Sequence, residues 1–225
     1  MDQASMKEVW KSMSKLLRSH PWHGIPIGEK APEIVNTYIE TVPTDTVKYE
    51  IDKQSGFLKA DRPHKYSSIC PTLYGFIPQT YCGQLIGEYC SKFTGRPDIE
   101  GDGDPLDICI LSEKTISHGD IMVRAIPIGG FRMIDQGQAD DKIIAVMKDD
   151  ALYKQWSDIS DCPEGFLDRL KHYFVTYKEL PTTTDPICEI THIYGRAEAF
   201  EVIRRSREDY KNKFSEISSF MNDLE

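Results

Sequence analysis

The chain has 225 residues and a formal net charge of −9, with 40% hydrophobic and 28% charged residues. This length and composition suit one globular domain with a full core. The acidic balance argues against a nucleic-acid partner, because a phosphate backbone is bound by a basic face. No apolar run approaches the ~18 residues of a membrane span, so we expect no membrane contact.

Residues 1–30 predict an N-terminal extension, in which apolar side chains at helical spacing indicate a short helix over 3–18. This stretch lacks the apolar run of a signal peptide. The six cysteines are widely spread and form no C-x-x-C pair, which argues against a zinc site. We therefore expect a cytoplasmic protein with reduced thiols. A bridge between Cys82 and Cys90 is the less favoured alternative.

Extended patterns follow. Apolar and polar residues alternate over Val35–Thr41 and Val47–Ile51, and both predict strands. A turn at 52–56, where Gly56 can supply a positive φ, leads into 57–60. Further apolar runs lie at 106–111, 121–128 and 142–147. The spacing of these runs and the many glycine and proline breaks favour a small barrel or sandwich over alternating βα units.

Residues 82–99 contain several glycine, proline and serine residues and predict a surface loop insertion. Helices are expected late in the chain. Pro163 can open one helix, whose apolar stripe includes Leu170 and Phe174. A longer C-terminal helix is expected over 196–220. We expect all of these elements to form a single domain, 1–225.

Three carboxylates lie within six residues, at Asp102, Asp104 and Asp107. Gly103 lets the backbone bend, and Pro105 favours an extended Asp104, so the first two carboxylates should project to one side. Like charges about 4 Å apart repel by ~1 kcal/mol in water and ~4 kcal/mol near a protein surface. Three converging carboxylates therefore need cations or a raised pKa. Oxygen ligands suit Mg2+ rather than zinc.

A solvated acidic turn is the simpler interpretation of this motif taken alone. An EF-hand fits poorly, because its sixth position requires glycine and, counted from Asp102, holds Asp107. A second acidic group follows, in which Asp135 and Asp140 flank a turn with Gly137, and Lys142 opens the next strand. Carboxylates beside a lysine suit a metal–phosphate site, although a charged hairpin tip is the favoured interpretation of this segment taken alone.

Taken together, the motifs resemble those of the soluble family I inorganic pyrophosphatases. The family signature Asp-x-Asp-Pro-x-Asp is present at 102–107. Other matching residues occur in the same order: Glu40, Lys48 to Lys53, Asp61-Arg62, Tyr74-Gly75, Asp135, Asp140, Lys142 and Tyr177-Lys178. The match runs from about residue 32 to 180. The chain departs from the family in the length of 82–99 and in Cys70, where relatives often carry an aromatic residue.

The resemblance implies a mainly β fold, an OB-like, highly twisted five-stranded barrel with flanking α-helices. It implies hydrolysis of pyrophosphate to two phosphates with three or four Mg2+ ions, in a homo-oligomer. Asp104 would be the general base for a water bridged between two metals. The other implied roles are metal ligands at Asp102, Asp107, Asp135 and Asp140, a water-mediated metal ligand at Glu40, and phosphate-binding residues at Lys48, Arg62, Tyr74, Lys142, Tyr177 and Lys178.

Two alternatives stay open on the residues alone. A metal-dependent phosphatase acting on nucleotides or organic phosphates would share the carboxylates. An OB-type binding module or a Ca2+-binding domain would be a non-enzyme. The chain has no P-loop and no Ser or Cys triad signature, which favours a metal-assisted hydrolysis without a covalent nucleophile.

Overall fold

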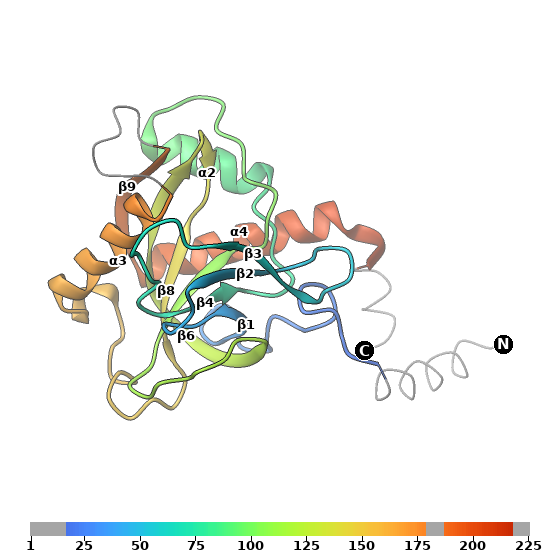
Figure 1. Ribbon diagram of the computed structural model, residues 1–225. Helices are drawn as coiled ribbons and strands as arrows, with labels where there is room; N and C mark the ends of the chain where they lie inside the picture. The colour runs from blue at the N-terminus through green and yellow to red at the C-terminus, as the bar shows by residue number, and fades with distance from the viewer. Residues whose placement is uncertain (1–16, 179–186, 218–225) are drawn as a thin grey trace.

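Five strands close into a ring in the computed structural model, which describes residues 17–178 and 187–217 (Figure 1). The antiparallel neighbours are β1 (Val35–Thr41) with β4 (Leu73–Phe76), and β4 with β5 (Asp107–Leu111). β5 pairs in parallel with β8 (Lys142–Met147), β8 pairs with β6 (Ile121–Asp135), and β6 returns to β1. The ring leaves no free edge among these strands. The predicted mainly β barrel of five strands with flanking helices is confirmed.

The strand β6 is the longest, because it passes beyond the barrel and pairs with two more strands. Its outer half pairs with β9 (Cys188–Gly195) and with the short β7 (Gln138–Ala139). The register shifts between Pro127 and Gly129, as at a β-bulge, which bends the strand. The run predicted at 121–128 is therefore only the first half of this strand.

Both faces of β5 and β8 are buried, which explains why their sequences are continuously apolar. Alternate residues enter two different cores. One core includes buried residues of the helices α2 (Gln84–Thr94) and α4 (Arg196–Lys213) together with Ile108, Ile110, Ile143 and Ala145. The other lies under α3 (Glu164–Thr176) and contains Cys109, Leu111, Ile144 and Val146.

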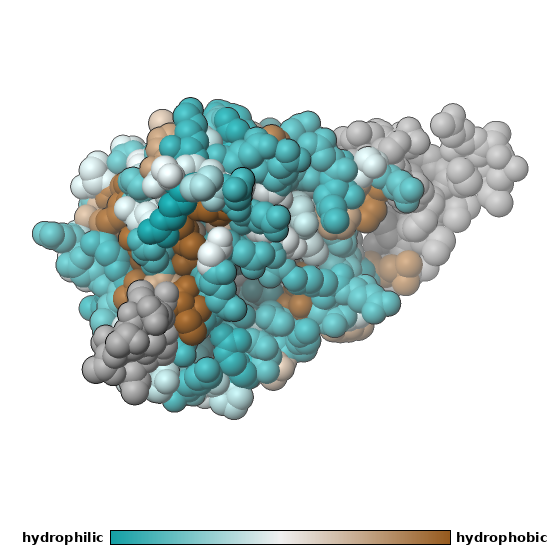
Figure 2. All heavy atoms as spheres, turned by 90° about the horizontal axis from the view of Figure 1, so that it is seen from above, coloured by the Kyte–Doolittle hydropathy of each residue, from teal (hydrophilic) through white to brown (hydrophobic). Residues whose placement is uncertain are grey.

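A hairpin of β2 (Val47–Ile51) and β3 (Leu58–Pro63) lies across the barrel (Figure 1). Gly56 has a φ of +73° in the connecting turn, as predicted. The second strand begins at Leu58 and reaches Pro63, beyond the expected 57–60. The face seen in Figure 2 is mostly hydrophilic, with apolar side chains in several separate patches.

The predicted late helices are α3 (Glu164–Thr176), which follows Pro163, and α4 (Arg196–Lys213). The second is shorter than the expected 196–220, and residues beyond 217 lie outside the described part. The helix expected over 3–18 also falls almost wholly outside it. None of the described helices is long and apolar enough to cross a bilayer. All six cysteines are free and buried, so the Cys82–Cys90 bridge is absent.

The prediction of a loop over 82–99 is wrong, because this segment contains the helix α2 (Gln84–Thr94). The carboxylate of Asp209 accepts hydrogen bonds from the backbone N–H groups of Gly83, Leu85 and Ile86 at 3.0, 3.0 and 3.1 Å. A charged acceptor there satisfies the free donors of a helix start. Gly95 ends the helix with a left-handed φ of +68°. The single-domain organisation stays a prediction.

Candidate active site

The loop that carries the acidic motif is bent rather than extended. Gly103 has a φ of +78°, and the backbone N–H of Asp104 donates to the Oδ1 of Asp102 at 3.0 Å. The expectation that these two carboxylates project together from an extended stretch is therefore wrong. They are related by a turn, which glycine permits at a positive φ. Cys82 holds this loop with two backbone hydrogen bonds, to Gly103 at 3.0 Å and to Asp104 at 2.8 Å.

The second acidic segment is a tight hairpin. Gln136 and Gly137 have φ values of +51° and +85°, as in the two-residue turns that join antiparallel strands. Asp135 and Asp140 flank this turn, as the sequence predicts. The N–H of Ala139 donates to the carbonyl of Glu100 at 2.8 Å, and Ala139 bridges to Gly101. This backbone contact brings the two acidic segments together.

Lys142 lies at the point where these segments meet. Its side chain is 2% exposed, and its ammonium group bonds to the carboxylates of Asp107 and Asp140. Burial alone would lower the pKa of Lys142, but the two carboxylates outweigh it and raise that pKa well above its usual value. Tyr74 adds a third polar group by donating its hydroxyl to Asp107 at 2.5 Å. Burial, and then the Asp107 charge, raises the pKa of Tyr74.

The carboxylates around Lys142 carry more negative charge than its ammonium group can neutralise. Burial, together with the charge of Asp140, raises the pKa of Asp102 to about 9. Burial also raises the pKa of Glu40 to about 8, although its Oε1 accepts the N–H of Ile51 at 2.7 Å. Buried acids with raised pKa values are stabilised in their ionised form by added cations. The all-oxygen donor set therefore fits hard divalent cations such as Mg2+.

Over residues 17–178 and 187–217, no three Asp, Glu, His or Cys side chains lie close enough together to enclose an ion as they stand. Lysine ammonium groups are bonded to the carboxylates instead. Lys178 bonds to Asp135, and Lys53 bonds to Asp104. The predicted ligands are thus neighbours of cationic side chains rather than a closed cage.

A cavity of about 80 Å³ brings Asp104 together with predicted residues from other elements. Its lining includes Glu40, Lys48, Tyr74 and Asp107. The Asp104 side chain remains 44% exposed, so water in this cavity can reach its carboxylate. Lys53 also lines the cavity. The sequence assigned it no role, and its only signal was that it ends the stretch from Lys48 to Lys53 that matches the family.

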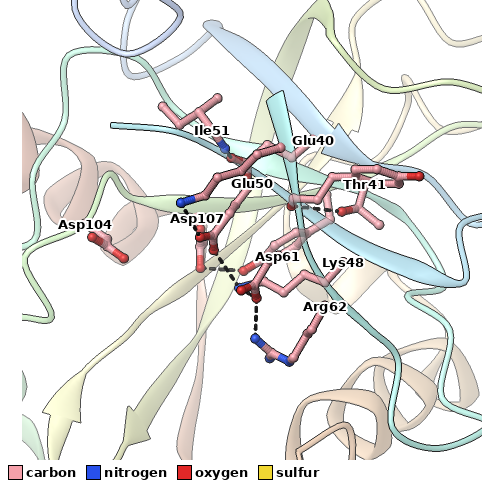
Figure 3. A network of polar contacts seen from close by, with 12 residues as sticks. Glu40, Thr41, Lys48, Glu50, Ile51, Asp61, Arg62, Asp104 and Asp107 are labelled. Atoms are coloured by element: carbon pink, nitrogen blue, oxygen red, sulfur yellow. Dashed lines mark hydrogen bonds and ion pairs between the residues drawn. The ribbon is translucent and has the colours of Figure 1, made fainter. Parts of the chain in front are cut away.

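The hairpin supplies a chain of opposite charges beside the cavity (Figure 3). Lys48 lies 3.2 Å from Glu50 and 3.5 Å from Asp61, and Arg62 bonds to Asp61. Glu50 and Asp61 are partners that the sequence analysis did not assign. The structure therefore joins the predicted phosphate-binding residues Lys48 and Arg62 through a shared carboxylate.

Tyr177 and Lys178 follow the end of α3. Besides its bond to Lys178, Asp135 accepts from the thiol of Cys188 at 3.4 Å, another contact that the sequence did not suggest. The Tyr177 ring stacks on Tyr173 with centroids 5.2 Å apart. Burial raises the pKa of Tyr177, and Lys142, Asp140 and Asp135 all act on that pKa electrostatically. Tyr177 therefore lies close to the second acidic segment and to Lys142.

Comparisons with known proteins give consistent matches in sequence and in fold. A family model described as inorganic pyrophosphatase matches residues 37–211. The chain is 52% identical over 199 residues to the inorganic pyrophosphatase of Chlamydia muridarum, covering 87% of this chain and 95% of that protein. It is 38% identical over 174 residues to soluble inorganic pyrophosphatase 1 of Arabidopsis thaliana, covering 77% and 73%. The crystal structure of inorganic pyrophosphatase from Thermus thermophilus matches with a TM-score of 0.71 at 32% identity, over 85% and 99% of the two chains.

Proposed function

The chain belongs to the inorganic pyrophosphatase family, whose activity is pyrophosphate hydrolysis, and we propose that it performs this reaction with Asp104 as the base and with Mg2+ held by the surrounding carboxylates. The observation that carries the proposal is the meeting of three distant segments at Lys142. Asp107 and Asp140 come from different segments and both bond to that one ammonium group, and the hydroxyl of Tyr74, from a third segment, bonds to the same carboxylate of Asp107. Such convergence does not occur in a solvated acidic turn.

The proposed metal ligands are Asp102, Asp107, Asp135 and Asp140, with Glu40 acting through water. The excess of buried carboxylate over ammonium charge supports this assignment. We propose three or four Mg2+ ions per active site. When bound, such ions lower the pKa of coordinated water and neutralise charge on the departing phosphate.

Asp104 is proposed as the general base because it combines solvent access with a fixed position. The hydrogen bond from its own N–H to Asp102 and the positive φ of Gly103 fix its backbone, while its carboxylate stays partly exposed. Hydrolysis of a phosphoanhydride depends mainly on positioning and electrostatics. A carboxylate with this placement can accept the proton of the attacking water.

The proposed phosphate-binding residues are Lys48, Arg62, Tyr74, Lys142, Tyr177 and Lys178. Their positions support this role, because Lys48 and Tyr74 line the cavity and Lys142 is bonded to Asp107 at its wall. Arg62 offers paired N–H donors, which match two phosphate oxygens. These groups neutralise a substrate that carries several negative charges.

Phosphate release from pyrophosphate and from ATP, with and without a chelator, tests the proposal. We expect rapid release from pyrophosphate, loss of release with excess EDTA and recovery on addition of Mg2+. Faster release from ATP would favour the alternative phosphatase, and no release from either would favour a binding module. We also propose a cytoplasmic homo-oligomer. A single-chain mass in solution would contradict the homo-oligomer.

A further inference from the structure

Arg132 is a buried cation outside the site described above. It lies in β6, and its side chain is 1% exposed. The guanidinium carbon is 4.7 Å from the ring centre of Phe93, 4.9 Å from that of Tyr89 and 5.3 Å from that of Tyr194. Three rings at these distances confine a planar cation.

Two carboxylates complete the environment of this cation. Its Nη2 lies 3.6 Å from Oδ2 of Asp141 and 2.9 Å from Oε1 of Glu198. Asp141 is 3% exposed and accepts the hydroxyl of Tyr194 at 2.9 Å. None of the three guanidinium nitrogens makes a well-aligned hydrogen bond to a described residue. Arg132 therefore acts on Asp141 mainly through charge.

Asp141 lies between two residues of the proposed site, Asp140 and Lys142. Successive side chains of an extended chain point to opposite sides. The contacts follow this alternation, because Asp140 and Lys142 bond to each other while Asp141 bonds to Tyr194 of β9. The contacts of Asp141 with Tyr194 and Arg132 thus fix the orientation in which Asp140 and Lys142 face the site.

The helix α2 packs on one side of the Arg132 guanidinium group. It supplies Tyr89 and Phe93, and the guanidinium of Arg205 covers Tyr89 at 4.5 Å. The same helix packs closely against the backbone that precedes Asp102. A Cβ added to Gly87 would lie 2.3 Å from the carbonyl oxygen of Ile99. The 82–99 segment therefore packs against both acidic segments of the site.

We propose that Arg132 is a positioning residue, which acts through Asp141 to hold Asp140 and Lys142 in the orientation that binds Mg2+ and phosphate. The proposal rests on the proposed function. Without Arg132, Asp141 would be a buried carboxylate with no cation opposite it. Turning Asp141 toward the cations of the site would relieve this, and that movement would displace both neighbours.

The test measures Mg2+ affinity by calorimetric titration without substrate, at a temperature where each variant is folded by circular dichroism. Groups that orient metal ligands typically contribute ~10–100-fold to metal affinity. We expect Arg132→Met to weaken Mg2+ binding by ~10-fold or more and to raise the KM for Mg-pyrophosphate. Arg132→Lys keeps a cation beside Asp141 and should restore most of the affinity.

Val202→Ala is the matched control, since Val202 is fully buried on α4 and has no polar group. It should lower the melting temperature while leaving Mg2+ affinity within ~2-fold. If Arg132→Met is not folded, Tyr194→Phe, which removes only the hydroxyl bonded to Asp141, should weaken Mg2+ binding several-fold. An affinity loss no larger than that of Val202→Ala would overturn the proposal. Asp140→Asn tests the proposed function separately from the role of Arg132. Unchanged Mg2+ binding in that variant would contradict the assignment of Asp140 as a metal ligand.

Discussion

Replacing Lys142 by methionine removes the ammonium group around which the site is arranged. The side chain is 2% exposed, and its partners Asp107 and Asp140 are only 21% and 10% exposed, so water cannot replace the lost cation. Removing one partner of a buried ion pair costs about 3–5 kcal/mol. A domain of this size loses about 2–4 °C of melting temperature per kcal/mol, so the metal-free variant should melt about 6–20 °C lower.

The assay is thermal and urea unfolding of the metal-free proteins at pH 7.5, followed by the same measurement with Mg2+. We expect Mg2+ to recover part of the lost stability, because it neutralises the same carboxylates. Pyrophosphate hydrolysis should stay low, because the phosphate partner is missing. Lys154→Met is the matched control at an exposed lysine and should change the free energy of unfolding by less than about 0.5 kcal/mol. Equal stability of the two variants would refute the reasoning.

Two further predictions concern pH and the helix α2. Burial raises the folded-state pKa of Glu40 to about 8 and that of Asp102 to about 9, above the ~4 of an unfolded chain. The folded state then holds these protons more tightly than the unfolded state. The free energy of unfolding of the metal-free protein should therefore fall as pH rises from about 4 toward 8, by at most about 1.4 kcal/mol per pH unit and proton. A free energy of unfolding that does not change with pH would count against buried acids. Asp209→Ala should destabilise the protein by about 1–2 kcal/mol in urea unfolding, because α2 loses its cap. The control Glu208→Ala, at an exposed position, should be nearly neutral, and equal effects of the two variants would disprove the cap.

The sequence predicts which segments meet in the candidate site because their residue types are uncommon in combination. Each acidic segment alone has a simpler reading, but three carboxylates around a proline, followed by a second acidic turn before Lys142 and by the upstream basic residues, favour one shared site. The apolar runs that form β5 and β8, which are buried on both faces, are part of the pattern that favours a small barrel or sandwich. The five-stranded barrel itself follows from the family resemblance and not from local patterns.

The features that the sequence does not reveal depend on distant partners. The helix α2 has no capping side chain of its own, because its cap is Asp209, more than a hundred residues later. The pairing of Lys53 with Asp104 and the environment of Arg132 likewise join separate segments. The sequence allows a bend at Gly103, but Pro105 suggested an extended Asp104, so the turn that joins Asp102 to Asp104 was not predicted. Such contacts exist only once the barrel has closed.

The most direct test of the mechanism compares wild-type protein with Asp104→Asn in pyrophosphate hydrolysis and in Mg2+ titration. The amide keeps the size of the side chain but removes the carboxylate charge, which accepts the proton in the proposed mechanism and also pairs with Lys53. Hydrolysis should fall by ~10²-fold or more while Mg2+ affinity stays within a few-fold. Asp98→Asn, at an exposed turn, should leave both quantities unchanged. Near-normal hydrolysis by Asp104→Asn would contradict the assignment of Asp104 as the base.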